Sequence, residues 1–256
     1  MADTVLHVAG ISKRFGGLQA LSEVGLTIQR GQIYGLIGPN GAGKTTFFNV
    51  ITGLYAPHSG VFELGGQPYV PSAVHLVAKA GIARTFQNIR LFADMTALEN
   101  VMVGRHIRTG SGLLGAIFRS RKFVAEEKAI AERARELLEY VGIARYADYK
   151  ARTLSYGDQR RLEIARALAT DPKLIALDEP AAGMNATEKV QLRELIDRIR
   201  RDDRTILLIE HDVKLVMGLC DRVTVLDYGR QIAEGTPADV QKNEKVIEAY
   251  LGTGGH

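Results

Sequence analysis

The sequence has very little cysteine, no long apolar run and no leader-like start. Its single cysteine, Cys220, excludes an internal disulfide and a cysteine-rich metal site, and it suits a reducing compartment such as the cytoplasm. No stretch approaches the roughly 18 consecutive apolar residues of a membrane-spanning helix. The first residues, MADTVLHVAG, lack the basic and then apolar order of a secretory signal peptide. Any role at a membrane therefore has to come through a partner.

The chain also has little excess charge. Its 256 residues include 33 Lys and Arg against 29 Asp and Glu, and the net charge of +4 is too small to indicate a nucleic-acid partner. With 46% hydrophobic and 24% charged residues, the composition is that of an ordinary folded protein, and we find no internal repeat. We therefore expect a globular protein that binds no nucleic acid.

Short β-rich runs alternate with helical patterns along most of the chain, which predicts an α/β fold with a mainly parallel sheet. The start differs, because glycine pairs between or after its short strands predict a small antiparallel sheet beside the main one. The strands expected in the small sheet are 4–11, 23–28 and 61–64, and those expected in the main sheet are 32–37, 174–177, 205–209 and 222–226.

Helical spacing of apolar residues predicts an amphipathic helix over residues 123–141. A further helix is expected after Asn185, which together with Glu188 matches a capping box. Residues 104–122 are rich in glycine and arginine, and we expect a basic loop or a short excursion out of the core there.

The stretch GLIGPNGAGKTTF, residues 35–47, places several glycines and a lysine directly after an expected strand. Residues 38–45 match G-x-x-x-x-G-K-[ST] at every fixed position, in the strand-then-helix context that this phosphate-binding motif requires. Backbone N–H groups from Gly41 to Thr45 can hold phosphate oxygens, Lys44 adds a full positive charge, and the Thr45 hydroxyl can bind Mg²⁺. The sequence thus predicts a nucleoside triphosphate site.

Two carboxylates follow a second apolar run, in LIALDEP, residues 174–180. Asp178 ends the expected strand at its carboxyl edge, where open α/β sheets bind their ligands, and Glu179 comes next. Mg²⁺ prefers oxygen ligands, and triphosphate hydrolysis needs a group that positions water. We expect Asp178 to hold Mg²⁺ through water and Glu179 to polarise the attacking water.

A second anion-binding helix start is expected in TLSYGDQRRLEIARAL, residues 153–168, where Ser155 and Gly157 precede a helical apolar pattern. One nucleotide rarely needs two such sites from one chain. Residues 154–159 resemble the signature motif of ATP-binding-cassette ATPases, whose usual form is LSGGQ. The match keeps the serine and the second glycine, but Tyr156 and Asp158 depart from the usual form.

The same resemblance extends over nearly the whole chain, from Phe15 to Pro237. The segment TFQNIRLF looks like the family's Q-loop with Gln87, and IEHDV looks like its switch region with His211. AAGMN, residues 181–185, occupies the place of the D-loop, although it departs from the common SALD form. Phe15 stands where the family places an aromatic ring that stacks on adenine. Within the family, residues 154–185 and the basic stretch 104–122 look most like the ATPase subunits of branched-chain amino acid importers.

The resemblance implies an ATP- and Mg²⁺-dependent ATPase that works as a head-to-tail dimer, with ATP between the phosphate loop of one chain and the signature motif of the other. It further implies transmembrane permease subunits, an extracytoplasmic substrate-binding protein reached through them, and a peripheral position on the inner face of the cell membrane. The implied catalytic residues are Glu179, His211 and Gln87, the metal ligands are Thr45, Gln87 and Asp178, and the nucleotide-binding residues are Phe15, Gly38, Asn40, Gly41, Ala42, Gly43, Lys44, Thr45, Thr46, Ser155, Gly157 and Gln159.

For domain organisation we expect one ATPase domain over residues 1–256. Its nucleotide-binding core, with the β subdomain, would span about 1–85 and 160–240, its helical subdomain with the signature motif about 88–158, and its tail 241–256.

Other functions stay open at this stage. A soluble cassette ATPase that acts on nucleic acid or ribosomes usually carries two cassettes, whereas this chain has one set of motifs. A P-loop GTPase or kinase is disfavoured, because the chain has no N-K-x-D motif and does have the signature. A lipopolysaccharide-type exporter, or an importer of urea or short amides, would have an ATPase much like this one.

Overall fold

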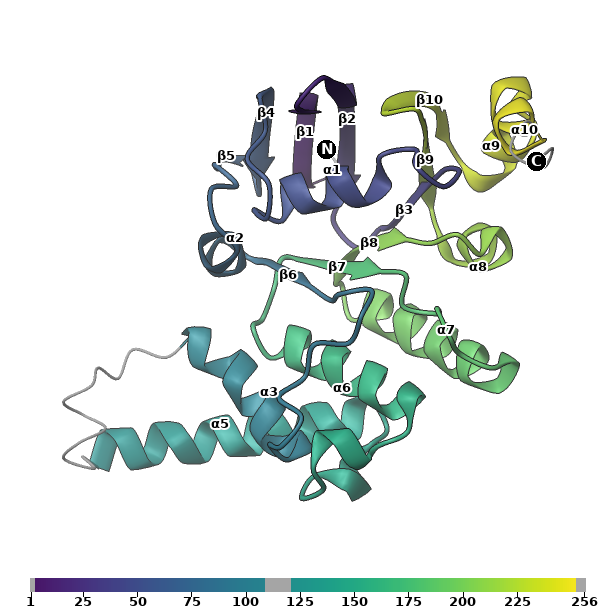
Figure 1. Cartoon of the computed structure of the whole chain (residues 1–256). Coiled ribbons are helices and arrows are strands. Elements are labelled where there is room, and N and C mark those ends of the chain that lie inside the picture. The colour runs from purple at the N-terminus through teal and green to yellow at the C-terminus, as the bar shows by residue number, and fades with distance from the viewer. Residues whose placement is uncertain (1–2, 109–120, 252–256) are drawn as a thin grey trace.

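The computed structural model describes residues 3–108 and 121–251 and places two sheets with helices on both sides of the larger one (Figure 1). The first sheet is antiparallel, with strand order β2-β1-β4-β5. Its strands are β1 (Thr4–Phe15), β2 (Leu18–Gln29), β4 (Ser59–Leu64) and β5 (Gln67–Pro68). The predicted antiparallel sheet at the start of the chain is therefore confirmed, with longer strands than the sequence indicated.

The second sheet has six strands in the order β10-β9-β3-β8-β7-β6. The five strands from β9 to β6 run parallel, and β10 pairs antiparallel with β9. The predicted α/β fold with a mainly parallel sheet is thus confirmed. The strands are β3 (Ile33–Ile37), β6 (Ile82–Arg84), β7 (Leu174–Asp178), β8 (Thr205–Ile209), β9 (Arg222–Asp227) and β10 (Arg230–Gly235).

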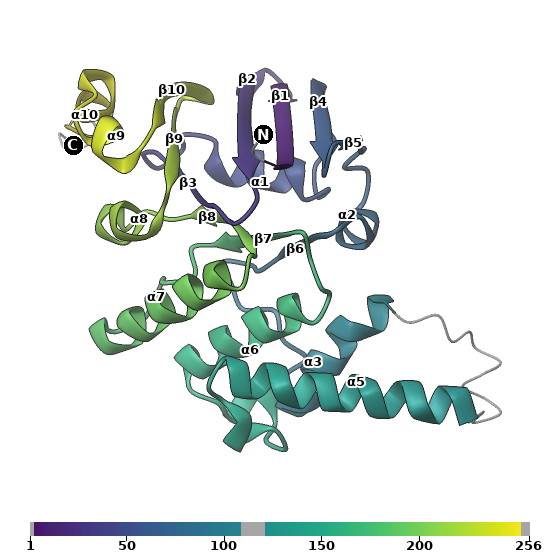
Figure 2. The same ribbon diagram turned by 180° about the vertical axis from the view of Figure 1, so that it is seen from behind.

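The helices form two groups that the larger sheet separates, as both views show (Figures 1 and 2). The first group, α1 (Lys44–Ile51) and α2 (Val74–Ala80), lies on the side of the small sheet. The other side carries α3 (Ala97–Arg105), α5 (Arg121–Tyr140), α6 (Tyr156–Leu168) and α7 (Ala186–Arg201). The core on this side also includes residues of α8 (Val213–Leu219), which packs against β3, and of α9 (Pro237–Gln241) and α10 (Glu244–Leu251), which lie beside the edge strand β10. Short 3-10 turns at His106–Arg108, Ala144–Tyr146 and Ala151–Thr153 complete the described elements. No described helix has the length and apolar character needed to cross a bilayer.

Strand β7 shows how the sheet sorts its side chains into two cores. Ile175 and Leu177 pack in the core on the α6 and α7 side, whereas Leu174 and Ala176 pack in the core on the α1 side. Since successive residues of a strand face opposite sides, Asp178 continues the series that faces α1. The alternation thus places this carboxylate on the same side of the sheet as the helix that follows the glycine-rich loop.

The capping box predicted at the start of α7 is confirmed. The Asn185 side chain accepts a hydrogen bond from the Glu188 N–H, and the Glu188 carboxylate accepts one from the Asn185 N–H in return. The amphipathic helix predicted over 123–141 is also present, as α5.

The loop predicted over residues 104–122 is wrong at both ends. Gly104 and Arg105 lie in α3, His106–Arg108 form a 3-10 turn, and α5 already begins at Arg121. Gly104 serves close packing instead, because a Cβ there would lie 2.3 Å from the Arg166 carbonyl oxygen of α6. Residues 109–120, which include Arg119 of the predicted basic stretch, lie outside the described residues.

The sole cysteine is buried where α8 packs against the larger sheet. Its Sγ would lie 3.0 Å from a Cβ placed on Gly35 of β3, so the two residues are in close contact. Burial raises the pKa of the Cys220 thiol well above its usual range.

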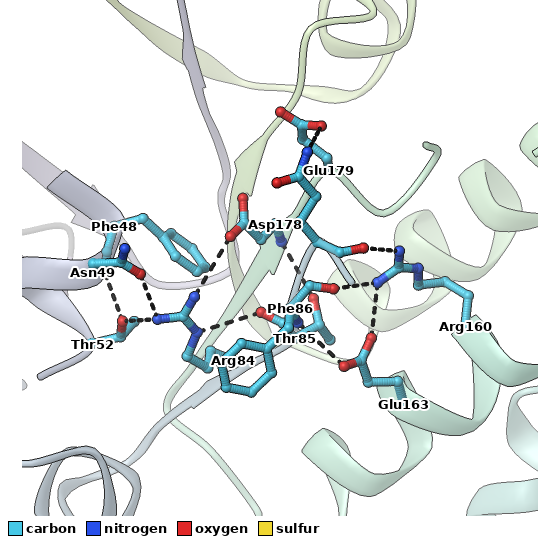
Figure 3. A network of polar contacts seen from close by, with 11 residues as sticks. Phe48, Asn49, Thr52, Arg84, Thr85, Phe86, Arg160, Glu163, Asp178 and Glu179 are labelled. Atoms are coloured by element: carbon cyan, nitrogen blue, oxygen red, sulfur yellow. Dashed lines mark hydrogen bonds and ion pairs between the residues drawn. The ribbon is translucent and has the colours of Figure 1, made fainter. Parts of the chain in front are cut away.

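A fully buried ion pair fastens α6 to the segment that follows β6. Arg160 and Glu163, one turn apart on α6, lie 2.9 Å from each other and have almost no exposed surface. Arg160 also donates hydrogen bonds to the carbonyl oxygens of Phe86 and Gln87, at 2.5 and 2.7 Å. Figure 3 shows Arg160 and Glu163 facing Phe86 from the helix.

The same segment donates its own N–H groups back to the helix. The backbone N–H of Phe86 and of Arg90 both donate to a Glu163 oxygen, at 3.2 and 3.4 Å. Burial raises the pKa of Glu163, and the Arg160 charge opposes that shift. Because these contacts join side chains to a loop backbone, α6 and the segment 86–90 are held together as one unit.

Removing one partner of this pair should be much more destabilising than removing an exposed pair. Arg160→Met leaves the Glu163 carboxylate buried and unpaired, and we expect a loss of about 3–5 kcal/mol in the free energy of unfolding. The double variant Arg160→Met/Glu163→Leu should lose less than the sum of the two single changes, because no uncompensated charge remains. Denaturant unfolding followed by circular dichroism measures all three.

The matched control is the exposed pair of Arg133 and Glu136 on α5, which lies at 2.8 Å with the same spacing. Arg133→Met should change the free energy of unfolding by no more than about 1 kcal/mol. Equal losses for Arg160→Met and Arg133→Met would contradict a structural role for the buried pair.

Candidate nucleotide-binding site

The glycine-rich loop of residues 38–43 connects β3 to α1 and requires glycine at its first position. Gly38 has a φ of 153°, and a Cβ there would lie 2.1 Å from the Leu226 carbonyl oxygen of β9. Any other residue would push the loop away from the sheet. The close approach fixes the start of the loop against β9 before the chain enters α1 at Lys44.

A cavity of about 440 Å³ opens over this loop and brings together most of the predicted nucleotide-binding residues. Its lining also includes residues from the β1–β2 hairpin and the β9–β10 turn, which the sequence analysis missed because they are distant in the chain: Leu18, Gln19, Ala20, Tyr228 and Gly229. The predicted residues in the lining are Phe15, Asn40, Gly41, Ala42, Gly43, Lys44, Thr45, Thr46, Gln87 and Glu179.

Lys44 points back into its own loop. Its Nζ donates hydrogen bonds to the carbonyl oxygens of Gly38 and Pro39, at 2.7 and 2.9 Å. Burial lowers the pKa of Lys44, whereas the nearby charge of Glu179 raises it. The ammonium therefore stands inside the cavity, where an anion would be an additional favourable partner.

The three predicted catalytic residues lie together, with Gln87 and His211 both beside the Glu179 carboxylate. The Gln87 Nε2 donates to a Glu179 oxygen at 2.8 Å, and the His211 Nδ1 lies 3.5 Å from the same oxygen. Glu179 has a φ of 43°, in the left-handed region that is uncommon for residues other than glycine. Its N–H donates to the Ile209 carbonyl of the neighbouring strand at 2.9 Å, which anchors this backbone. The carboxylate is thus aimed from the sheet edge into the cavity.

Asp178, just before it, is only 4% exposed. Burial raises its pKa to about 6, although the Arg84 charge opposes the shift. Its backbone N–H donates to the Thr85 hydroxyl at 3.3 Å. The carboxylate is a desolvated oxygen donor on the α1 side of the sheet, the type of ligand that Mg²⁺ prefers.

Sequence reasoning missed Arg84, the last residue of β6. Arg84 pairs with Asp178 at 3.5 Å, and both side chains are buried. Burial lowers the pKa of Arg84 to about 10. The three-residue strand β6 is too short to show a periodic pattern, so nothing in the sequence marked this arginine as an interior residue.

Glu210 was missed as well. It is fully buried after β8 and accepts N–H bonds from Ala181 at 2.9 Å and from His211 at 3.2 Å. Burial raises the pKa of Glu210. Its contacts join the segment after Glu179 to His211, the histidine that lies beside the Glu179 carboxylate. The only sequence signal was a carboxylate placed directly after four apolar strand residues.

Phe15 lies at the rim of the cavity with 42% of its surface exposed. It meets Tyr55 edge to face, with ring centroids 5.2 Å apart, and the Lys13 ammonium lies 5.1 Å from its centroid. The ring is thus partly exposed at the mouth of the phosphate cavity.

The predicted signature residues do not line this cavity. Ser155 caps α6, where it accepts the Asp158 N–H at 3.2 Å and donates to the Asp158 carboxylate at 2.8 Å. Gln159 turns back to donate to the Leu154 carbonyl at 2.9 Å. Gly157 packs against the Glu188 side chain, which would lie 2.7 Å from a Cβ. Within one chain, these residues and the phosphate loop form separate sites.

Comparison with known proteins places the chain in a family. The family model described as ABC transporter matches residues 21–182, and the model described as branched-chain amino acid ATP-binding cassette transporter matches residues 230–256.

Two curated relatives are 45% identical over 253 residues, which covers 98% of this chain and 99% of each relative. They are the high-affinity branched-chain amino acid transport ATP-binding proteins BraF of Pseudomonas aeruginosa and LivG of Escherichia coli K12. The crystal structure of the ADP conformation of MJ1267, an ATP-binding cassette of an ABC transporter, matches with a TM-score of 0.84 and 33% identity, over 97% of this chain and 99% of that one. The chain therefore belongs to the ABC transporter family, as one of its nucleotide-binding ATPase subunits.

Proposed function

We propose that this chain powers an importer of branched-chain amino acids by binding and hydrolysing Mg·ATP. The observation that supports hydrolysis is the meeting of Gln87 and His211 at the Glu179 carboxylate, because Glu179 and Gln87 line the cavity over the phosphate loop. The substrate class follows from the two relatives and from the second family model, which covers the C-terminal residues 230–256.

The phosphate cavity supplies both charge and directed N–H groups for a triphosphate. Backbone N–H groups at the start of α1 and the Lys44 ammonium would bind phosphate oxygens. Thr45, Asp178 and Gln87 offer a hydroxyl, a buried carboxylate and an amide, a donor set that fits Mg²⁺ because all three can offer oxygen. When bound, Mg²⁺ would supply positive charge to the phosphate oxygens.

Glu179 is the proposed general base. It accepts a proton from water as that water attacks the γ-phosphorus, the bond to the β-phosphate oxygen breaks, and ADP leaves. Gln87 and His211 hold the carboxylate by the contacts described above, and both also lie where they can orient the water. The strained backbone of Glu179 suits a residue whose direction matters more than its local stability.

The separation of Ser155 and Gly157 from the phosphate loop supports a site shared between two chains. We propose that two ATPase subunits, identical or related, pack head to tail, so that the α6 N-terminus of each completes the nucleotide site of the other. ATP would then contact both chains only when the pair is closed, and hydrolysis would remove the contacts that hold the pair together.

A groove beside the Gln87 segment supports a transmembrane partner. It has a volume of about 290 Å³ and lies among α2, β6, α3 and α6. Most of its exposed lining is apolar, as expected for a site that receives an amphipathic helix of a permease subunit. Its lining includes Val77, Ile82, Phe86, Phe92 and Val103. This docking would hold the chain at the inner face of the membrane, with the substrate-binding protein reached through the permease.

We also propose the domain division predicted from the sequence. The helical subdomain, about residues 88–158, would move against the core formed by about 1–85 and 160–240, while the segment 241–256 is a tail. Arg160 and Glu163, which this division places in the core, fasten the segment 86–90, so the helical subdomain would move only beyond this loop.

Glu179→Gln should separate ATP binding from ATP hydrolysis. Glutamine keeps the size of the side chain and one acceptor oxygen but cannot take up the proton, so turnover should fall by about 10²–10⁴-fold. Because ATP is bound and not consumed, the variant should form a stable dimer with Mg·ATP, whereas wild type should be mainly monomeric. Steady-state ATPase rates and light-scattering masses, with and without Mg·ATP, measure the two effects.

Glu194→Gln is the control for that experiment, because this glutamate is exposed on α7, away from the cavity. It should behave as wild type in both assays. ATP turnover by Glu179→Gln within a few-fold of wild type would reject Glu179 as the base, and a monomer with ATP bound would reject the shared site for the isolated subunit.

Phe15→Ala should weaken ATP binding by about 1–3 kcal/mol, since a ring stacked on a nucleobase contributes that much in comparable sites. Isothermal titration of ATP measures the change. Tyr149→Ala is a suitable control, because Tyr149 is also an exposed ring in an edge-to-face pair, with Tyr146 at 5.6 Å, but does not line the cavity. Unchanged affinity in Phe15→Ala would remove this ring from the adenine site.

A further inference from the structure

Arg84 connects two elements that carry residues of the phosphate site. Its guanidinium donates to the Asn49 side-chain oxygen at 3.0 Å and to the Thr52 hydroxyl at 2.6 Å, both at the end of α1. On its other side it pairs with the Asp178 carboxylate at 3.5 Å. Figure 3 shows Arg84 between Asn49 and Thr52 on one side and Asp178 on the other.

Two aromatic rings hold the guanidinium in place. Its Cζ lies 4.6 Å from the centroid of Phe48 and 4.4 Å from that of Phe86. The side chain is only 7% exposed, so water contributes little to its position. Stacking and forked hydrogen bonds together define where the planar group lies, and a lysine ammonium could not reproduce this combination.

This connection matters because the sheet does not join the two elements directly. The helix α1 follows β3, Asp178 ends β7, and β8 lies between these strands. Thr45 on α1 and Asp178 on β7 are the ligands proposed to face the same ion from these two elements. Among the described side-chain contacts, those of Arg84 reach both α1 and the Asp178 carboxylate.

We propose that Arg84 is a positioning residue that fixes the Asp178 carboxylate relative to α1, so that Asp178 and Thr45 are prearranged for one Mg²⁺ ion. This inference rests on the proposed Mg·ATP site. Arg84 itself would touch neither the ion nor the nucleotide. It acts through Asp178, engaging one carboxylate oxygen while the strand end and the Thr85 hydroxyl hold the backbone.

The test compares nucleotide affinity with and without magnesium. Arg84→Lys keeps the positive charge but loses the fork, so we expect the Mg²⁺ concentration that half-saturates ATP binding to rise by about 10-fold or more. In EDTA, where α1 and the loop bind the phosphates without the ion, affinity should stay within about twofold of wild type. Equilibrium titration with a fluorescent ATP analogue over a range of MgCl₂ concentrations measures both, and a thermal melt confirms folding.

Two further variants locate the effect. Thr52→Val breaks a bond at the α1 end and leaves the ion pair, so it should raise the Mg²⁺ requirement in the same direction as Arg84→Lys. Arg90→Lys is the matched control, because Arg90 also stacks on Phe86, at 4.3 Å, but no described contact joins it to Asp178. Its Mg²⁺ requirement should equal that of wild type.

Each outcome decides the matter. An unchanged Mg²⁺ requirement in folded Arg84→Lys would overturn the inference, and so would an equal loss of affinity with and without Mg²⁺, which is the result of a purely structural role. Failure of wild type itself to bind ATP more tightly with Mg²⁺ would instead reject the proposed function. A selective rise in the Mg²⁺ requirement of Arg84→Lys and Thr52→Val, without one in Arg90→Lys, would establish the positioning role of Arg84.

Discussion

The site depends on one constraint, which is that charged groups buried away from water must be compensated by partners. A buried carboxylate or guanidinium is tolerated only when charged or hydrogen-bonding partners compensate for lost solvation. Asp178 therefore lies against Arg84, and Glu163 against Arg160. Because moving either member of a pair would leave the other uncompensated, the need to satisfy these charges also sets their positions. The two hydrophobic cores exclude water from these side chains, and the ion pairs fix where the charged groups lie.

The sequence predicted those parts of the site that depend on neighbouring residues. The glycine loop, the strand that ends at Asp178 and the capping box at Asn185 all lie within a few residues of their own signals. Arg84, Glu210 and the bonds from Arg160 to the loop could not be predicted, because their partners lie far away in the chain and become neighbours only through the sheet order. The convergence of Gln87 and His211 on Glu179 was implied by resemblance alone.

Gln87 is held at both its ends by groups from different parts of the fold. Its carbonyl oxygen accepts from Arg160 of α6, while its side-chain amide donates to Glu179 at the sheet edge. A shift of α6 relative to the sheet must therefore either withdraw the amide from the carboxylate or break a contact with a fully buried cation. Breaking the contact with the buried Arg160 costs more free energy than withdrawing the amide. A shift of α6 is therefore expected to change the polar environment of Glu179.

The burial of the sole cysteine makes this chain a convenient background for site-specific labelling. A thiol that is shielded by α8 and has a raised pKa presents little thiolate to a maleimide or iodoacetamide reagent while the protein is folded. A cysteine introduced at an exposed position would therefore react selectively without prior removal of Cys220. Reaction at Cys220 itself would in turn report the opening of the packing between α8 and β3, so the natural residue serves as an internal gauge of whether a labelled sample has kept its fold.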